Sequence, residues 1–280
     1  MRIARVNGAT GPVYVVQAGD ESWVELGSLG IHVTTTPELV NAADALAALD
    51  VSAMGGGLVD PSFLAPIVAP GKLMAIGLNY ADHIRETGSK APANPILFVK
   101  ANTSLTGPED DIVVDPELTS MADYETELTL IIGRETKGIS EADARSVVFG
   151  YTVANDVSAR DCMKADGQLV RAKSFDTYCP IGPWITTADS VPDPQALAVK
   201  TLVNGEVRQD SSTAEMIFSI DHLIYFLARG MTLEPGDVML TGTPHGVGFV
   251  MDPPRFLHAG DVVECEVEGL GKLRNRVVGP

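Results

Sequence analysis

Two glutamates, Glu125 and Glu127, alternate with threonines in the segment 123–132. In a β-strand, residues two apart point to the same face, so both carboxylates project the same way about 7 Å apart. A third carboxylate, Asp156, follows an apolar run where a strand is expected to end. Three carboxylates suit Mg²⁺ or Mn²⁺ better than Zn²⁺, which prefers His and Cys. Spacing alone leaves two alternatives open, a solvated strand face and a turn-capping aspartate.

A histidine and a glutamate three residues apart, His83 and Glu86, form a second candidate group. One helical turn would place imidazole and carboxylate on the same side, so that the glutamate orients the ring and raises its basicity. A surface pair with the same spacing is the alternative. The next residues, 89–95, contain two prolines and are typical of a mobile lid.

The segments that must position these groups contain more strand signals than helix signals. Strand runs or turns that start strands are expected at 128–132, 147–153, 203–206, 236–237 and 260–261, and helices at 141–148 and 220–229. Strands joined by hairpins, with few crossover helices, indicate an α+β or mainly β domain with a largely antiparallel or mixed sheet.

Three prolines in the segment 61–71 mark the expected domain boundary. Before it, we expect strands at 3–6, 14–17 and 22–26 and an Ala-rich helix from 36 to about 49. We therefore divide the 280 residues into a small N-terminal α+β domain, 1–70, and a catalytic domain, 71–280.

The charge balance excludes several classes of protein. With 37 acidic and 20 basic residues, the net charge is −17, which disfavours nucleic acids and anionic lipid as partners. No apolar run reaches the length of a membrane span or of a signal peptide core. Three cysteines without Cys-x-x-Cys spacing indicate reduced thiols and a cytoplasmic location. If the substrate is a small anion, a bound cation would offset the repulsion.

Seven ordered blocks resemble the fumarylacetoacetate hydrolase family and together cover nearly all of residues 72–278. They are GLNYADHIRE, PILFVKANTSLTGPEDDIVV, DYETELTLIIG, GYTVANDVSARD, RAKSFDTYCPIGPW, NGEVRQDSSTAEMIF and LEPGDVMLTGTPHGVG. The resemblance implies a mixed β-sandwich roll, a small leader domain and a homodimer.

The resemblance also implies roles for individual residues. Glu125, Glu127 and Asp156 match the family's ligands for Mg²⁺ or Mn²⁺, and Lys173 matches a lysine beside the metal and substrate. His83 and Glu86 match the dyad that activates water in the family's hydrolases, and Thr241 matches a residue that contacts the substrate carboxylate.

One position departs from the family pattern. Met163 stands where many relatives have a glutamine that reaches the substrate, and a thioether cannot donate that hydrogen bond. Gln168 and Arg171 are the candidates to replace it in substrate binding. The glycines of residues 242–248 lack the Gly-Lys-Ser/Thr of a phosphate loop, and we expect them to let backbone approach the site.

These residues predict a hydrolase that cleaves a C–C bond in a 2,4-diketo acid of the acylpyruvate type. His83 and Glu86 would activate the water, and the metal and Lys173 would stabilise a pyruvate-type enolate. The same enolate serves two alternatives: decarboxylation of an oxaloacetate-like acid, and isomerisation or tautomerisation of a 2-oxo or 2-hydroxy-dienoate acid such as 2-hydroxyhepta-2,4-diene-1,7-dioate. A metal-dependent binding protein without catalysis is less favoured, because the complete set of candidate residues is present.

Overall fold

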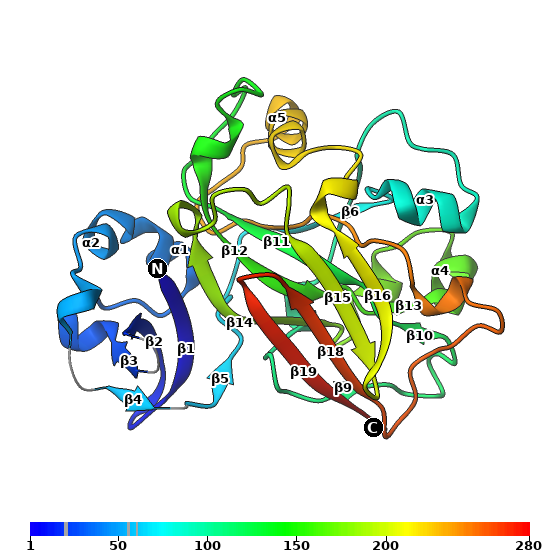
Figure 1. Cartoon of the computed structure of the whole chain (residues 1–280), viewed down its shortest axis with the longest axis horizontal. Coiled ribbons are helices and arrows are strands. Elements are labelled where there is room, and N and C mark those ends of the chain that lie inside the picture. The colour runs from blue at the N-terminus through cyan, green and yellow to red at the C-terminus, as the bar shows by residue number, and fades with distance from the viewer. Residues whose placement is uncertain (20–21, 55–56, 60) are drawn as a thin grey trace.

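The structure is a computed structural model that describes residues 1–19, 22–54, 57–59 and 61–280. In this part of the chain, two main β-sheets pack against each other (Figure 1). Short helices lie around them, and the N-terminal strands, blue in Figure 1, extend the larger sheet to one side. This architecture confirms the predicted α+β fold with a mixed, largely antiparallel sheet.

The larger sheet contains twelve of the described strands. Its order is β4-β3-β2-β1-β14-β12-β11-β17-β6-β7, with β5 paired to β1 and β8 paired to β14. The pairs β17–β6 and β14–β8 are parallel, and the other described pairs are antiparallel. The strands are β1 (Arg2–Gly8), β2 (Gly11–Ala18), β3 (Ser22–Glu25), β4 (Leu58–Val59), β5 (Phe63–Leu64), β6 (Leu73–Gly77), β7 (Ile96–Val99), β8 (Leu105–Thr106), β11 (Thr126–Ile132), β12 (Val148–Asn155), β14 (Cys179–Thr187) and β17 (Val238–Leu240).

The smaller sheet has the order β16-β15-β18-β19-β9, and β10 and β13 form a separate pair. Apolar side chains of both main sheets belong to one buried cluster, and burial of this surface stabilises the packing. The strands are β9 (Ile112–Val113), β10 (Ala122–Asp123), β13 (Ser158–Ala159), β15 (Ala198–Val203), β16 (Glu206–Ser212), β18 (Val262–Val267) and β19 (Gly271–Val278).

The helices among the described residues are short. The α-helices are α1 (Thr36–Asn41), α2 (Ala43–Ala47), α3 (Ala81–Thr87), α4 (Arg160–Asp166) and α5 (Ile220–Gly230). The 3₁₀ helices are η1 (Leu26–Leu29), η2 (Val51–Ala53), η3 (Asn102–Ser104), η4 (Ala144–Val147), η5 (Arg171–Lys173), η6 (Ala188–Ser190), η7 (Thr213–Glu215) and η8 (Gly248–Val250). None of these described helices is long and apolar enough to span a membrane.

Several predicted elements are confirmed. β11 contains the apolar run at 128–132 and is buried along its whole length, while β12 contains most of the run at 147–153. Asn204 and Gly205 form the turn between β15 and β16, with φ angles of 54° and 79° that suit this residue pair. The predicted helix at 220–229 is α5, and Ser219 caps its N-terminus.

Two predicted helices differ from the structure. The helix at 141–148 is wrong: Ser140 Oγ donates to Asp143 Oδ2 (2.6 Å) in a turn, η4 follows, and β12 begins at Val148. Val148 pairs with Ile132 of β11, so sheet pairing prevails over the local capping pattern. The helix predicted from 36 to about 49 is divided into α1 and α2, because Ala42 has a ψ of 11°.

The boundary predicted near residue 70 is crossed by the larger sheet. β1 pairs with β14, and Ile3, Leu39 and Ile185 belong to one buried cluster. The division into an N-terminal and a catalytic domain stays a prediction. The shared sheet means that the first residues of the chain support a strand of the larger part.

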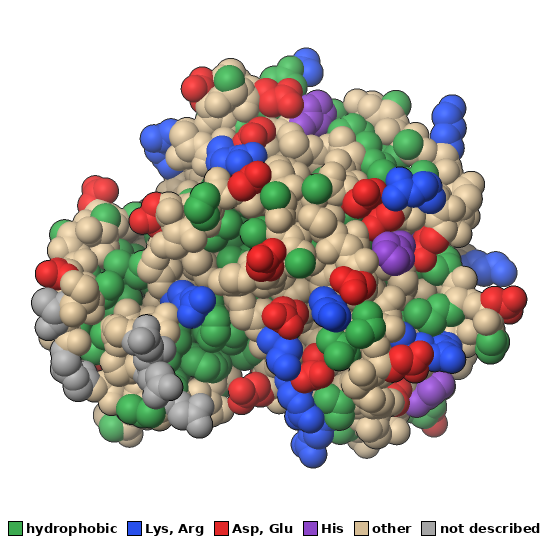
Figure 2. Space-filling model, viewed as in Figure 1, with side chains coloured by type: hydrophobic (Ala, Val, Ile, Leu, Met, Phe, Trp, Pro, Cys, Tyr) green, Lys and Arg blue, Asp and Glu red, His purple; other side chains and the backbone are tan. Residues whose placement is uncertain are grey.

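The surface charges and the cysteines can be compared with the predictions about polyanionic partners and reduced thiols. On the face shown in Figure 2, basic side chains lie beside acidic ones and also in a short row at the lower centre. Cys162, Cys179 and Cys265 are all buried and unpaired, in agreement with reduced thiols.

Candidate active site

The predicted acidic triad is brought together at one end of β11 and β12. Asn155 Oδ1 accepts the Glu125 N–H (2.9 Å), and the Asp156 N–H donates to the Glu125 carbonyl oxygen (2.8 Å). Glu125, Glu127 and Asp156 are buried, and one carboxylate oxygen from each lies within 4.8 Å of the other two. A divalent ion with oxygen ligands at about 2.0–2.6 Å allows oxygen separations up to about 4–5 Å. The three carboxylates therefore fit one hard cation.

Two buried lysines balance part of this negative charge. Lys173 Nζ donates to Glu125 Oε2 (2.9 Å), Asp156 Oδ2 (2.5 Å) and Ser158 Oγ (2.7 Å). Lys100 Nζ donates to Asp156 Oδ1 (2.6 Å) and to the Lys173 carbonyl oxygen. Burial lowers the pKa of Lys173, but Asp156 and Glu125 outweigh it and the net pKa is raised. Lys173 is therefore charged beside the triad.

Glu125 and Glu127 have opposite electrostatic surroundings. Burial raises the pKa of Glu125, but Lys173 and Arg160 bring it down to about 2. Glu127 has no cationic side chain of the described residues within 4.0 Å, and its Oε2 accepts the Gly242 N–H (2.6 Å). Burial, Asp156 and Glu125 raise the pKa of Glu127 well above its ordinary value. A carboxylate in this position needs a proton or a cation.

The predicted dyad forms on α3. His83 Nδ1 and Glu86 Oε1 are 2.6 Å apart on one helical turn, and Gly88, with a φ of 64°, caps the C-terminus of α3. The His83 side chain is 7% exposed and lines the same cavity as Glu125 and Lys173. Because Nδ1 faces Glu86, that carboxylate selects the tautomer and leaves Nε2 for a substrate.

The glycine-rich segment after β17 holds the carboxylates of the site by their oxygens. Gly242 N–H binds Glu127, Gly246 N–H donates to Glu86 Oε2 (2.8 Å), and Gly248 N–H donates to Asp123 Oδ1 (2.8 Å). A Cβ at Gly246 would lie 2.1 Å from the Arg208 carbonyl oxygen, so this close approach requires glycine. The expectation that these glycines let backbone approach the site is confirmed.

His83, Glu125 and Lys173 line a cavity of about 340 Å³. α3 and α4, which lie at the same end of the molecule in Figure 1, supply part of its wall. Its polar lining residues are His83, Glu125, Arg160, Lys173 and Thr243, and its apolar ones are Ile76, Leu78, Ile96, Phe98, Met163, Leu169 and Phe249. Polar groups gathered within an apolar wall are typical of a small-molecule site.

Arg160 is a site residue that the sequence analysis did not single out. Its Nη2 lies 2.6 Å from Glu125 Oε1 and 2.9 Å from Asp123 Oδ2, and its guanidinium lies over the Phe249 ring at 4.4 Å. Asp123 is fully buried and also accepts the N–H groups of residues 248 and 249. The sequence did contain a signal for Asp123 and Arg160, because each lies close to a triad residue. Asp123 lies two positions before Glu125, and Arg160 lies four positions after Asp156.

The structure does not bring the three proposed substrate-binding residues to the cavity wall. Thr241 is buried, and its Oγ1 donates to the Leu128 carbonyl oxygen (2.8 Å), while Thr243 lines the cavity. Arg171 is exposed, and its guanidinium pairs with the Asp166 carboxylate (2.7 Å) outside the cavity lining. Gln168 is exposed, and its Oε1 accepts the N–H of residue 170 (2.6 Å). Met163, by contrast, lines the cavity.

Comparison with known proteins decides the family. The family model described as fumarylacetoacetate (FAA) hydrolase C-terminal matches residues 72–278. The chain belongs to the fumarylacetoacetate hydrolase family. The predicted resemblance is confirmed, and with it membership in a family of enzymes.

Relatives in the fumarylacetoacetate hydrolase family carry several activities in their names. Oxaloacetate tautomerase Fahd2a, mitochondrial, of Rattus norvegicus is 46% identical over 218 residues, which cover 78% of this chain and 69% of that protein. A solved fumarylacetoacetate hydrolase (EaFAH) of Exiguobacterium antarcticum has a TM-score of 0.90 at 36% identity, with 100% of both chains covered. A 2-hydroxyhepta-2,4-diene-1,7-dioate isomerase structure of Mycobacterium marinum has a TM-score of 0.80 at 35% identity, covering 100% of this chain and 98% of that one.

Fumarylacetoacetate hydrolase family enzymes are typically dependent on a divalent metal, and the triad fits one. The Glu127 carboxylate has no cationic partner among the described residues, and a divalent ion would supply the positive charge that balances it. All three side chains offer the oxygen ligands that Mg²⁺ and Mn²⁺ take, and these ligands do not separate the two ions.

Metal binding is expected to release protons and to tighten as the pH rises. The raised pKa of Glu127 means that a proton competes with the ion, so the apparent Kd for Mg²⁺ should fall with increasing pH and level off above that pKa. Calorimetric titrations in two buffers of different ionisation enthalpy count the protons, and we expect net proton release at a pH below the raised pKa of Glu127. A Kd that is independent of pH from the ordinary glutamate pKa upwards would contradict this role of Glu127.

Proposed function

We propose that this chain catalyses the enol–keto tautomerisation of oxaloacetate or a closely related small 2-oxo acid. The observation that carries the proposal is that His83, Arg160 and Lys173 line one cavity beside the acidic triad. A proton-transfer group and two fixed cations thus face the same small space. Similarity to an oxaloacetate tautomerase and to a dioate isomerase favours this alternative over the hydrolysis first predicted.

The residues act at different atoms of the substrate. A divalent ion held by Glu125, Glu127 and Asp156 would supply a Lewis acid for the carboxylate and 2-oxo oxygens. Lys173 stabilises the negative charge that develops on the C2 oxygen. Arg160 offers its guanidinium to the second carboxylate.

Proton transfer falls to the dyad. In the keto-to-enol direction, His83 Nε2 takes a proton from C3, and the C–H electron pair becomes the C2–C3 double bond. The π electron pair of the C2 carbonyl moves to its oxygen, which then takes a proton from the His83 imidazolium, and the reverse sequence gives the keto form. Glu86 stabilises the imidazolium that exists between the two transfers.

One set of assays tests the proposal. With Mg²⁺ present, we expect the protein to accelerate the loss of enol absorbance of oxaloacetate without accelerating pyruvate release. Pyruvate release from an acylpyruvate at a comparable rate would support hydrolysis instead, and CO₂ release from oxaloacetate would support decarboxylation. Absence of catalysis on all these acids would contradict an enzymatic role.

Replacing Met163 with glutamine is expected to lower KM for oxaloacetate about threefold to tenfold, with little change in kcat. Met163 lines the cavity, and its sulfur lies 3.9 Å from Arg160 Nη1. A side-chain amide at this position can donate to the second carboxylate of the substrate, which we assign to Arg160. One such hydrogen bond contributes about 0.5–1.5 kcal/mol. Met163→Leu, which keeps the volume without a donor, is the control in steady-state kinetics. Equal KM values for the two variants would remove this assignment.

The predicted assembly and location remain proposals. A homodimer is testable by light scattering on the full chain, and a monomer at micromolar concentration would contradict it. The cytoplasmic location predicted from the cysteine pattern has the same standing.

A further inference from the structure

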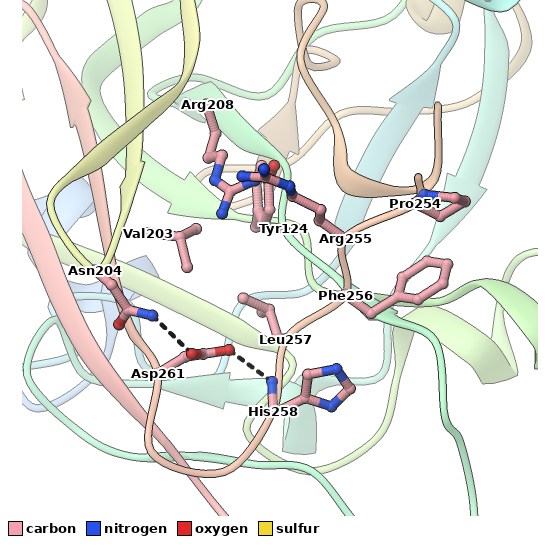
Figure 3. A pocket seen from close by; sticks show the side chains of 10 residues that line it. All are labelled: Tyr124, Val203, Asn204, Arg208, Pro254, Arg255, Phe256, Leu257, His258 and Asp261. Carbon is pink, nitrogen blue, oxygen red and sulfur yellow. Dashed lines mark hydrogen bonds between the residues drawn. The ribbon is translucent and has the colours of Figure 1, made fainter. Parts of the chain in front are cut away.

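A second cavity lies between the β15–β16 hairpin and the segment 254–261 (Figure 3). Its volume is about 330 Å³, and it shares no described lining residue with the active-site cavity. Tyr124, which directly precedes the triad residue Glu125, forms part of its wall. Arg208, Arg255 and His258 line this cavity together with one acidic residue, Asp261.

The two arginines converge on one carboxylate position. Arg208 Nη2 lies 3.3 Å from Glu206 Oε2, and Arg255 Nη1 lies 2.8 Å and 3.0 Å from the two oxygens of Glu206. Figure 3 shows both guanidinium groups beside the Tyr124 side chain. The Glu206 side chain is 59% exposed, so its carboxylate is solvated and replaceable. The arrangement defines where an oxygen anion from solution would sit.

Arg208 is the less satisfied of the two arginines. Its side chain is 11% exposed, its Nε is buried with no hydrogen-bond partner, and its Nη1 contacts the Met251 sulfur at 3.4 Å. The His258 side chain, which Figure 3 shows at the far side of the cavity, has no hydrogen bond to any described residue. Arg208 Nε is thus a buried donor without an acceptor, and the His258 side chain is exposed to solvent. Such a buried donor favours an oxyanion as the occupant.

We propose that this cavity is an effector site for a small oxyanion, the carboxylate or phosphate group of a metabolite, which Arg208 and Arg255 bind in place of Glu206.

The cavity wall is joined to the catalytic dyad by direct contacts. Tyr124 OH donates to the Gly246 carbonyl oxygen (3.0 Å), and the Gly246 N–H donates to Glu86 Oε2 (2.8 Å). Gly246 also packs directly on the backbone of Arg208. An anion that moves Arg208 therefore shifts the peptide that positions Glu86, and through it the His83 ring. Binding at the two sites is coupled in both directions.

Calorimetric titration of the metal-free full chain tests the site itself. Inorganic phosphate and acetate, in separate arms, show whether a phosphate or a carboxylate is bound. For the oxyanion that binds, Arg208→Gln and Arg255→Gln should each weaken binding about tenfold or more, since charge-assisted hydrogen bonds are lost. Glu206→Gln should tighten it about twofold to fivefold, because a competing carboxylate is removed.

Arg276→Gln is the matched control, because Arg276 is 68% exposed, pairs with Asp111 and does not line the cavity. Binding by this variant should equal that of the unchanged protein. No saturable binding of either anion, or equal binding by Arg208→Gln, would overturn the site. Circular dichroism establishes that each variant is folded. Neither readout depends on the proposed activity.

Kinetics test the coupling. The bound oxyanion should change KM or kcat for oxaloacetate at least about twofold in the unchanged protein. Tyr124→Phe, which removes the hydroxyl that contacts Gly246, should bind the anion normally but respond less than the unchanged protein. An equal response in Arg208→Gln would place the effect in the active site and overturn the coupling.

Discussion

Replacing Lys173 with methionine is expected to lower kcat for oxaloacetate tautomerisation about 10²–10³-fold, with a smaller change in KM. The ammonium group is buried and borders the cavity at the triad, where the C2 oxygen of a chelating 2-oxo acid would carry its developing charge. A cation fixed at such a position acts more strongly on the transition state than on the ground state. Methionine keeps the length of the side chain without the charge.

The structural role of Lys173 must be separated from its chemical one. Its removal leaves Glu125 and Asp156 with less compensation, so we also expect a lower Tm in metal-free protein and partial recovery with Mg²⁺. Kinetics should therefore be measured with Mg²⁺ well below the Tm of the variant. Lys164→Met, at an exposed position of α4, is the control and should be neutral. Wild-type kcat in Lys173→Met would remove Lys173 from the chemistry.

The acidic triad could be predicted because part of its geometry follows from local rules and the rest from the family resemblance. Strand alternation places Glu125 and Glu127 together, and the position of Asp156 after an apolar strand gives a third oxygen at the sheet end. The antiparallel pairing of β11 with β12, which brings that strand end to the glutamates, is a long-range contact. The family resemblance supplied only the expectation that the three carboxylates meet at one metal, since the spacing within each segment does not identify its partner strand.

The rest of the site depends on contacts that spacing does not encode. Arg160 becomes part of the cavity wall because Asp123 and Phe249, from distant segments, fix its guanidinium. Arg171 does not, because its guanidinium pairs with Asp166, the last residue of α4. The glycine N–H groups that hold Glu86 and Glu127 are backbone donors, which have no side-chain signature at all.

The helix predicted at 141–148 failed for a related reason. Its capping-box spacing is a local preference worth about 1 kcal/mol, whereas Val148 gains a place in a buried strand of the central sheet. Tertiary pairing therefore decides the element, and the capping residues form a turn before it.

Replacing Glu127 with glutamine is expected to abolish Mg²⁺ binding at millimolar concentrations of the ion, because one charged ligand is lost. Without the ion's Lewis acidity, kcat should fall by about three orders of magnitude or more. The same change should stabilise the metal-free protein. Burial and two neighbouring carboxylates raise the pKa of Glu127, so the folded state binds a proton more tightly than the unfolded state. Stability contributed by this group is therefore present at low pH and is lost as the pH rises above its ordinary value towards the raised one.

Glutamine is neutral at every pH and avoids this loss. In chelator, the Tm of Glu127→Gln should exceed that of the unchanged protein, and the difference should grow as the pH rises from the ordinary glutamate pKa towards the raised pKa of Glu127 and level off above it. With Mg²⁺ the order should reverse, because the ion stabilises the unchanged protein alone. Glu117→Gln, at an exposed position, should show neither effect. The substitution that stabilises the metal-free protein therefore also removes its metal binding and its activity. This opposition between stability and function is what a metal ligand requires. If chelator and Mg²⁺ left the Tm difference unchanged, Glu127 would not be a ligand.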